Sequence, residues 1–325
     1  MQIKIMAFAI AMGVAIAAAP ANAQTETSFE DWLTDLRAEA LLDGIREETL
    51  DASFVGVTPI PRVIELDRRQ PESTLTFEQY VDRIVSSARV DRGRARLAEN
   101  SPLLHEVAVK FGVQPRFIVA LWGIETNFGQ NTGGFSVIAA LATLAYDGRR
   151  SKYFRGELLD ALRIIDQGHI RPEVMKGSWA GAMGQSQFMP SSFMNFAYDY
   201  DGDGAKDIWN TSSDVFASAA NYLSGVGWKS DITWGREVRV PDGFDPALAD
   251  LKVIKQMSEW QALGVRRADG SDLPTREIPA SVVFPGKVGG PAYLVYDNYR
   301  ALLRWNRSLY FATAVGLLSD KIAGR

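Results

Sequence analysis

The sequence predicts a mainly helical protein of the α+β class, in which a large set of helices carries one small lobe with β-strands. Apolar residues recur at helical spacing through most of the chain up to about residue 230. The pattern then changes between residues 231 and 292, where Pro and Gly recur and β-branched residues cluster between turns. The residues that indicate these strands are Val238, Val240, Ile278, Val282 and Val283.

The first residues have the pattern of an export signal. Lys4 supplies a positive charge, Ile5 to Ala19 form an apolar run, and Ala21 and Ala23 are the small residues that a signal peptidase inspects. This run is too short to span a bilayer comfortably, and no later stretch is long and apolar enough. We therefore expect residues 1–23 to be a signal peptide and the mature chain to be soluble in the periplasm.

The predicted helices follow from caps and breakers along the chain. Ser28 to Asp31 has the form of a capping box, and helices are expected from there to a stop at Phe111-Gly112. Pro115 suits the first turn of the next helix, which is apolar all round and is therefore expected to be buried. Further helices are expected at about residues 137–145, 153–165, 213–225, 251–263 and 296–321.

Composition excludes several classes of function. The net charge is −4 and no basic stripe appears, which argues against a nucleic-acid-binding protein. The chain has no Cys, so it has no thiol nucleophile, no disulfide and no lipidated cysteine. With only His105 and His169, there is little room for a His-rich metal site or a Ser-His-Asp triad. We expect a monomer without a membrane anchor.

Glu125 is the candidate catalytic group. It closes the apolar helix in the segment Gly123-Ile-Glu-Thr-Asn-Phe-Gly129. A carboxyl at the end of a buried helix is desolvated, which raises its pKa and lets it donate a proton near neutral pH. The structural alternative is a partly buried Glu that is paired with an Arg or capped by backbone groups.

The segment from Gly177 to Ser191 is a candidate sugar-binding region. Small residues let the backbone approach a ligand, Ser178, Gln185 and Gln187 offer neutral hydrogen bonds, and aromatic residues offer flat apolar faces. Tight helix packing through Gly and Ala is the structural alternative. The spacing is not that of a nucleophile elbow or of a phosphate-binding loop.

A third motif is Asp199-Tyr-Asp-Gly-Asp-Gly-Ala-Lys-Asp207. Carboxylates at alternate positions with a Gly at the sixth are typical of the first half of an EF-hand loop, although the twelfth position is Asn210 rather than Glu. Asp214 is placed to complete the ligand set from the next helix. We expect a hard cation, calcium, here; a solvent-exposed Asp/Gly turn is the alternative.

Taken together, these stretches make the chain resemble the B-type lytic murein transglycosylases, glycoside hydrolase family 103. The resemblance runs in the family's order across nearly the whole mature chain. Its motifs lie at residues 66–72, 120–129, 140–146, 177–184, 187–191, 201–204, 221–228 and 304–308.

The resemblance implies a lysozyme-like helical core, an N-terminal helical lobe and the small β-containing lobe. The expected boundaries are 24–105 for the N-terminal lobe, 106–230 for the catalytic core, 231–292 for the small lobe and 293–325 for a C-terminal helix. It implies that Glu125 is the catalytic acid and that a further set of residues lines the glycan cleft: Ser178, Gln187, Tyr222, Asn306 and Tyr310. It also implies a structural calcium site, with no cofactor required for the chemistry, formed by Asp199, Asp201, Asp203, the Ala205 carbonyl and Asp214.

The activity implied is cleavage of the β-1,4 bond between N-acetylmuramic acid and N-acetylglucosamine in peptidoglycan strands, leaving a 1,6-anhydro end. A hydrolysing muramidase is the alternative enzyme, and it needs a second carboxyl, for which Asp147 and Glu157 are the candidates, with Glu157 expected on a helix face. A non-catalytic glycan-binding scaffold is the alternative from another class.

Overall fold

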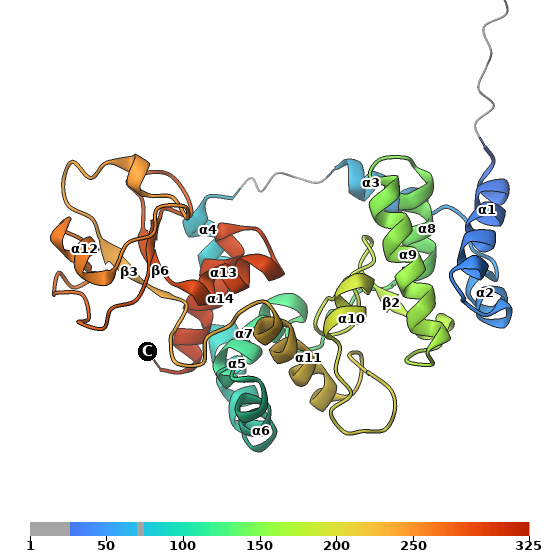
Figure 1. The fold of residues 1–325 in the computed structure, drawn as a ribbon, viewed down its shortest axis with the longest axis horizontal. Coiled ribbons are helices and arrows are strands. Elements are labelled where there is room, and N and C mark those ends of the chain that lie inside the picture. Colours follow the sequence, from blue (N-terminus) through green and yellow to red (C-terminus); the bar gives the residue numbers. More distant parts are fainter. Residues whose placement is uncertain (1–26, 70–74, 325) are drawn as a thin grey trace, which may run out of the picture.

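The structure, a computed structural model, describes residues 27–69 and 75–324. The predicted signal peptide and part of the motif at residues 66–72 lie outside the described residues. Helices α1, α2, α3, α8 and α9 lie at one end of the molecule, and strands β3 and β6 with helix α12 lie at the other (Figure 1). Helices α5, α6, α7 and α11 occupy the middle.

Helices dominate the described chain. The first eight are α1 (Phe29–Leu42), α2 (Glu47–Phe54), α3 (Pro61–Arg68), α4 (Phe77–Ile84), α5 (Ser87–Glu99), α6 (Ser101–Phe111), α7 (Pro115–Thr126) and α8 (Val137–Tyr146). The others are α9 (Ser151–Asp166), α10 (Pro190–Phe196), α11 (Ser212–Gly225), α12 (Met257–Ala262), α13 (Asp297–Trp305) and α14 (Leu309–Ile322). Two 3-10 turns lie at Pro172–Val174 and Pro246–Leu248.

The helices form two packing groups that do not follow the order of the chain. Helices α2 and α3 pack against α9 and α8, whereas α4, α5 and α6 pack against α7, α11 and α14. The boundary expected at residue 105 therefore does not separate these two groups. The chain leaves the first group after α3, enters the second with α4, and returns with α8 and α9.

The small lobe is an antiparallel four-stranded sheet with the strand order β4-β3-β6-β5. Its strands are β3 (Gly235–Arg239), β4 (Arg266–Arg267), β5 (Ser281–Val283) and β6 (Ala292–Val295). The lobe has an apolar cluster of its own around Trp260, whose indole N–H donates to the Ala280 carbonyl over 3.0 Å. Strands β1 (Phe135–Ser136) and β2 (Lys176–Gly177) pair in a separate short ribbon.

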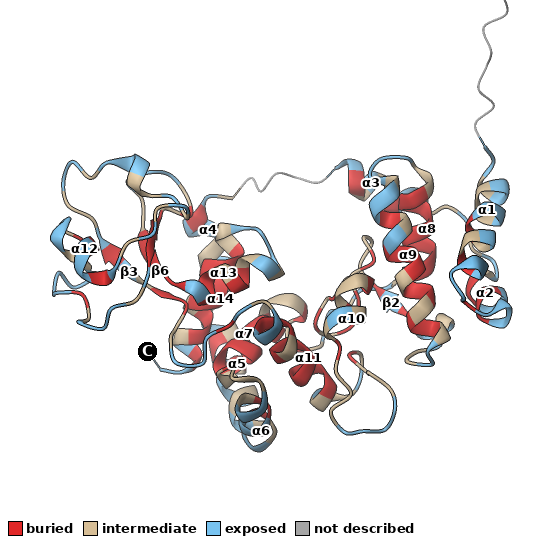
Figure 2. Ribbon diagram, in the orientation of Figure 1, coloured by how far each residue is buried: buried red, intermediate tan, exposed pale blue. Residues whose placement is uncertain are grey.

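Burial is greatest in the helices at the centre of each packing group (Figure 2). Every residue of α7 from Arg116 to Gly123 is buried, as is every residue of α8 from Val137 to Ala145. The helix that carries Glu125 is apolar on all its faces, and its burial was predicted for that reason. The structure confirms this prediction. One continuous apolar core joins the two helical groups.

Two predicted helices differ from the observed ones. The helix expected at residues 251–263 is only Met257–Ala262, because Gln256 and Glu259 form a capping box that starts it there. The helix expected at residues 296–321 is two helices, because Ser308 caps the start of α14 by accepting a hydrogen bond from the Phe311 N–H. This break leaves residues 306–308 as a loop between α13 and α14.

Among the described residues, no single helix is long and apolar enough to cross a membrane. Helices α6 and α7 pass that test only as a pair, across a bend of 110°.

Candidate active site

Glu125 lies in the last turn of α7, at the point where the chain reverses. The helix ends because Asn127 and Phe128 adopt left-handed conformations, with φ angles of 53° and 61°, and Gly129 continues the turn. Thr126 fastens this turn, since its hydroxyl donates to the Gln185 carbonyl over 3.0 Å and accepts from the Gly129 N–H. The backbone on both sides of Glu125 is therefore fixed by the fold.

Among the residues that the structure describes, the half-buried Glu125 carboxyl has one hydrogen-bond donor. The indole Nε1 of Trp305 donates to its Oε1 over 2.7 Å. Burial raises the pKa of Glu125 to about 7, and the indole donor opposes this because it favours the carboxylate. A carboxyl with this pKa exchanges a proton readily near neutral pH, as a general acid and base must.

The pocket beside Glu125 is mostly apolar. Its lining comprises Ile118, Leu121, Trp122, Glu125, Gln185, Ser186, Val215, Phe216, Ala219 and Trp305. Among these residues Glu125 is the only acid. Apolar walls account for the desolvation of the carboxyl, and Gln185 is held in place by hydrogen bonds to the Trp122 indole and the Trp209 carbonyl.

The two other candidate carboxyls, Asp147 and Glu157, form hydrogen bonds with residues other than Glu125. Asp147 accepts a hydrogen bond from Arg68 over 2.8 Å. Glu157 lies on α9, as expected, and its side chain is buried. Both of its oxygens are held by Ser191, at 2.9 Å from the backbone N–H and 2.7 Å from the hydroxyl, because the start of α10 supplies unpaired donors there.

Aromatic rings connect Tyr222 to Glu125. The Tyr222 ring lies 4.8 Å from the Trp305 ring and 5.7 Å from that of Phe188. Its hydroxyl donates to the Arg304 carbonyl over 2.7 Å, which ties α11 to the end of α13. Tyr222 thus lies one side chain away from the carboxyl, although it is itself almost buried.

Ser178 and Gln187 lie at the short β1–β2 ribbon. The Ser178 hydroxyl accepts hydrogen bonds from the N–H groups of Ala180 and Ala182, and so shapes its own turn. The Gln187 amide donates to the Thr132 and Gly184 carbonyls over 3.1 and 2.9 Å. These bonds leave a hydroxyl proton on Ser178 and the amide oxygen of Gln187 available to a ligand.

Asn306 and Tyr310 flank the break between α13 and α14. Asn306 is exposed, and its side-chain oxygen accepts from the Ser308 N–H over 3.0 Å. Tyr310 is half-buried, with its ring 5.3 Å from Phe77 and 5.6 Å from Tyr80. Burial and then the negative charge of Glu125 raise the pKa of Tyr80, so Tyr80, on α4, lies within electrostatic range of the carboxyl.

Sequence reasoning missed two of these neighbours as site residues. Trp305 donates to Glu125 from 180 positions further along the chain, although it lies in the motif at residues 304–308. That motif was the signal that pointed to it. Tyr80 carries no such signal, because only the packing of α4 against α14 brings it near the site.

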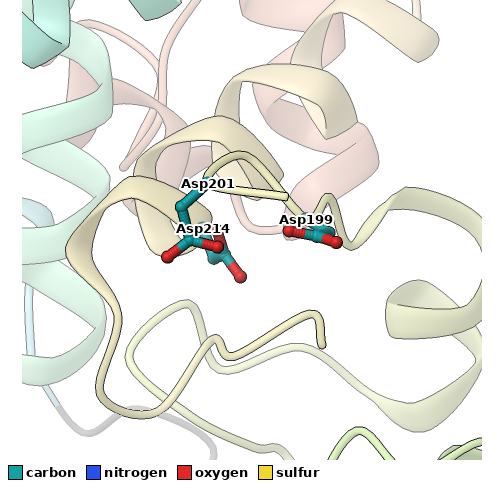
Figure 3. A group of neighbouring side chains, drawn as sticks. All are labelled: Asp199, Asp201 and Asp214. Carbon is teal, nitrogen blue, oxygen red and sulfur yellow. The ribbon is translucent and has the colours of Figure 1, made fainter. Parts of the chain in front are cut away.

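Three carboxylates of the Asp/Gly loop converge. Oxygens of Asp199, Asp201 and Asp214 all lie within 4.8 Å of one another, with Asp214 reaching in from the start of α11 (Figure 3). Asp214 is only 1% exposed. It accepts from the Tyr200 and Asp207 N–H groups over 2.9 and 2.8 Å.

The donor chemistry of this loop fits a hard cation such as calcium, since a buried carboxylate beside two others needs a compensating charge. Asp203 is not part of the converging group, because its side chain turns to accept from the Ala205 N–H over 2.8 Å. Gly202 and Gly204, with φ angles of 76° and 94°, let the loop turn so that both donate to Asp199.

Comparison with known proteins agrees with this fold. Residues 28–320 match the family model of the transglycosylase SLT domain. The chain is 30% identical over 251 residues to the membrane-bound lytic murein transglycosylase B of Escherichia coli, covering 75% of this chain and 67% of that protein.

Two solved structures are similar over most of the chain. SltB3 from Pseudomonas aeruginosa in complex with NAG-anhNAM-pentapeptide superposes with a TM-score of 0.89 at 45% identity, covering 91% of this chain and 80% of that one. The lytic transglycosylase Slt35 of Escherichia coli in complex with calcium superposes with a TM-score of 0.77 at 28% identity, covering 90% and 92%. This chain therefore belongs to the transglycosylase SLT family. It is an enzyme, a lytic transglycosylase with the lysozyme-like helical core that the sequence resemblance implied.

Proposed function

We propose that this enzyme cleaves the β-1,4 bond between N-acetylmuramic acid and N-acetylglucosamine in peptidoglycan strands and leaves a 1,6-anhydro end, with Glu125 as acid and then base. The supporting observation is the half-buried carboxyl of Glu125, with a pKa raised to about 7, while the other candidate acids Asp147 and Glu157 are held by Arg68 and Ser191. A hydrolase that uses two carboxyls needs the second within about 5–10 Å of the first.

In the first step, protonated Glu125 donates its proton to the bridging oxygen as the bond from C1 to that oxygen breaks. The acetamido group of the same muramic acid stabilises the positive charge that develops at C1. Glu125 is left as a carboxylate, which the Trp305 indole stabilises by its hydrogen bond.

In the second step, the Glu125 carboxylate accepts the proton of the muramic acid C6 hydroxyl, and that oxygen forms a bond to C1. The carboxyl returns to its protonated form and no water is consumed.

The glycan strand is assigned a set of binding residues: Ser178, Gln187, Tyr222, Asn306 and Tyr310. The free hydrogen-bonding capacity of Ser178 and Gln187 supports their part in this set. Tyr222 is nearly buried and its hydroxyl is occupied, so we assign it to the wall of the cleft through its ring.

Mass spectrometry of the fragments that the protein releases from purified peptidoglycan tests this proposal. We expect anhydro ends, one water lighter than reducing ends, from the wild type and none from Glu125→Gln. Reducing ends would instead indicate a hydrolase. Release of fragments by Glu125→Gln would overturn the assignment of the catalytic acid.

Calcium is proposed as a structural ion held by Asp199, Asp201 and Asp214. The Ala205 carbonyl and Asp203 are proposed as further ligands, because the family resemblance implies them. The convergence of the three carboxylates and the calcium complex of Slt35 support this assignment. We expect a chelator to lower the melting temperature while the rate at 25 °C stays within about twofold, because a ligand that binds only the folded state stabilises it. Asp214→Asn should abolish this response to the chelator, and a melting curve of the wild type that calcium does not move would contradict the assignment.

Export to the periplasm is proposed from the pattern of residues 1–23, which lie outside the described residues. N-terminal sequencing of the protein recovered from a periplasmic extract should begin at Gln24. A chain that retains Met1 would contradict it. The expectations of a monomer and of a protein without a membrane anchor stay predictions.

A further inference from the structure

The turn that follows Glu125 has a backbone conformation that its own residues do not favour. Asn127 and Phe128 are consecutive non-glycine residues with left-handed φ angles of 53° and 61°. This conformation costs free energy in any residue with a Cβ atom, and most in one with a bulky side chain. It persists only where the surrounding structure holds it. The position of the last turn of α7, which carries Glu125, therefore depends on contacts from outside that turn.

Helix α5 packs against α7 and supplies a polar contact to this turn (Figure 1). The Nη1 group of Arg92 donates to the side-chain oxygens of Asn127 and Gln130, over 2.8 and 3.3 Å. The Asn127 amide donates in turn to the same Gln130 oxygen over 2.7 Å. The three side chains therefore form a closed triangle of hydrogen bonds, in which each restricts the other two.

The next residue of α5 provides room for Phe128. A Cβ atom at Gly93 would lie 3.5 Å from the Phe128 ring, so the absence of a side chain lets the helix approach the ring closely. Adjacent residues of α5 thus contact both left-handed residues of the turn. Arg92 holds Asn127 through its side-chain oxygen, and Gly93 lies against the ring of Phe128.

Arg92 differs from its neighbours on α5 in the partners of its guanidinium group. Arg94 and Arg96 each pair with an acid one turn away on the same helix. Within residues 27–69 and 75–324, the side chain of Arg92 instead donates to the two amide oxygens of the turn. A charged donor makes stronger hydrogen bonds to such oxygens than a neutral donor does. The guanidinium of Arg92 is therefore committed to the turn.

We propose that Arg92 is a positioning residue of this enzyme, which acts through Asn127 and Gln130 to fix the carboxyl of Glu125 for proton transfer. This inference rests on the proposed function, in which Glu125 is the acid and then the base. A displacement of a catalytic group by about 1 Å costs up to about a hundredfold in rate. Because Arg92 bonds to the turn, its loss changes where the carboxyl lies and leaves the proton-transfer chemistry itself unaltered.

A purely structural role for Arg92 is the alternative, because the same bonds join α5 to the end of α7. Loss of a structural role lowers the free energy of unfolding and leaves the rate of each folded molecule unchanged. Loss of a positioning role lowers the kcat of folded molecules while the affinity for glycan is kept. The two roles are therefore separated by kcat and KM per folded molecule, with the folded fraction measured by near-UV circular dichroism.

The first test compares Arg92→Ala with the wild type on solubilised glycan strands from purified peptidoglycan. We expect kcat per folded molecule to fall at least about tenfold, because the carboxyl is displaced, and KM to stay within about twofold. The matched control is Arg94→Ala, on the same helix, which changes the net charge equally and loses a bond of 2.8 Å to the Lys321 carbonyl. This control should retain kcat within about twofold.

Three results of this comparison would overturn the proposal. One is a kcat of Arg92→Ala within about twofold of the wild type, whatever its melting temperature. Another is a rise in KM at an unchanged kcat, which would place Arg92 in substrate binding. The third is an equal fall of kcat in Arg94→Ala, which would make the effect one of charge or of α5 as a whole.

The second test replaces the partner, and it stands even if Arg92→Ala fails to fold. Asn127→Gly removes the side-chain acceptor, and glycine adopts the left-handed conformation of this position without strain. We expect the same loss of kcat as in Arg92→Ala and no further loss in the double variant, because both changes break one contact. A wild-type kcat in Asn127→Gly, or losses that multiply in the double variant, would contradict the proposal.

Failure of the proposed function is distinguishable from failure of this inference. It appears in the chemical nature of the released ends and in the activity of Glu125→Gln. The ratio of kcat between Arg92→Ala and Arg94→Ala reports only on the contact between α5 and the turn.

Discussion

The catalytic core holds two shielded glutamates that differ in how their charges are compensated. Glu125, at the end of α7, has one hydrogen-bond donor for two oxygens and lies in an apolar pocket. Glu157, in α9, is more deeply buried, yet each of its oxygens has a donor from Ser191. Burial alone therefore does not mark a catalytic acid.

The two carboxylates differ in the hydrogen-bond donors that surround them. Glu157 compensates the unpaired N–H groups at the start of α10, so its charge contributes to the fold. Glu125 is left under-compensated, so its charge is costly and its proton is easily returned. Residues that serve stability and residues that serve chemistry can thus be of the same type and both be shielded, and differ in the number of their hydrogen-bond donors.

The largest expected effect comes from removing the proton of Glu125. Glu125→Gln keeps the shape of the side chain, but it cannot transfer a proton in either step, and we expect at least about a thousandfold loss of kcat. Glycan binding should persist. Measuring the rate together with a binding isotherm checks this, and Ser191→Ala, which alters the other glutamate's partner, is the control that should retain its rate.

The second effect is a pH-dependent difference in stability between the wild type and Glu125→Gln. The folded-state pKa of Glu125 is about 7 against an ordinary 4.5, so the folded state binds this proton more tightly than the unfolded chain. The resulting stabilisation is fully present below about pH 4.5 and is lost as the pH rises to about 7, a difference of roughly 3 kcal/mol. Urea unfolding at several pH values measures it, and parallel curves for the two proteins would refute the raised pKa.

The third effect is a loss of stability when Glu157, rather than Glu125, is replaced. Glu157→Gln replaces one acceptor oxygen by an amide that cannot accept from Ser191, and we expect the free energy of unfolding to fall by about 2 kcal/mol. The rate per folded molecule should stay within about twofold of the wild type. A folded Glu157→Gln protein with a tenfold lower kcat would instead make Glu157 the second carboxyl of a hydrolase.

The smallest expected effect is a shift in the pKa of Glu125. Trp305→Phe removes the indole donor, which favours the carboxylate, so the pKa of Glu125 should rise and the alkaline limb of the pH–rate profile should move to higher pH. The matched control is Trp209→Phe, which loses an indole bond to the Lys176 carbonyl instead. If both variants move the limb equally, Trp305 does not set this pKa.

Local signals in the sequence predicted the fold class and the location of Glu125. The helix of Pro115 is apolar all round, its start has a proline, and both features depend only on neighbouring residues. The converging aspartates Asp199 and Asp201 were found in the same way, from alternate spacing within one loop.

The features that sequence reasoning missed depend on contacts between distant segments. Trp305 meets Glu125 only because α13 packs on α11 and α14. Whether Glu157 is buried or exposed depends on the position of Ser191, which no periodicity within α9 reveals.

The turn that follows Glu125 has a consequence for the tolerance of this enzyme to mutation. Phe128 is held in its left-handed conformation with its ring directly on Gly123, where a Cβ atom would lie 2.7 Å from the ring. Even alanine at position 123 would force the ring away, and the last turn of α7 would move with it. A genetic screen for inactive alleles should therefore recover substitutions at this buried glycine, in protein that still accumulates to near-normal levels.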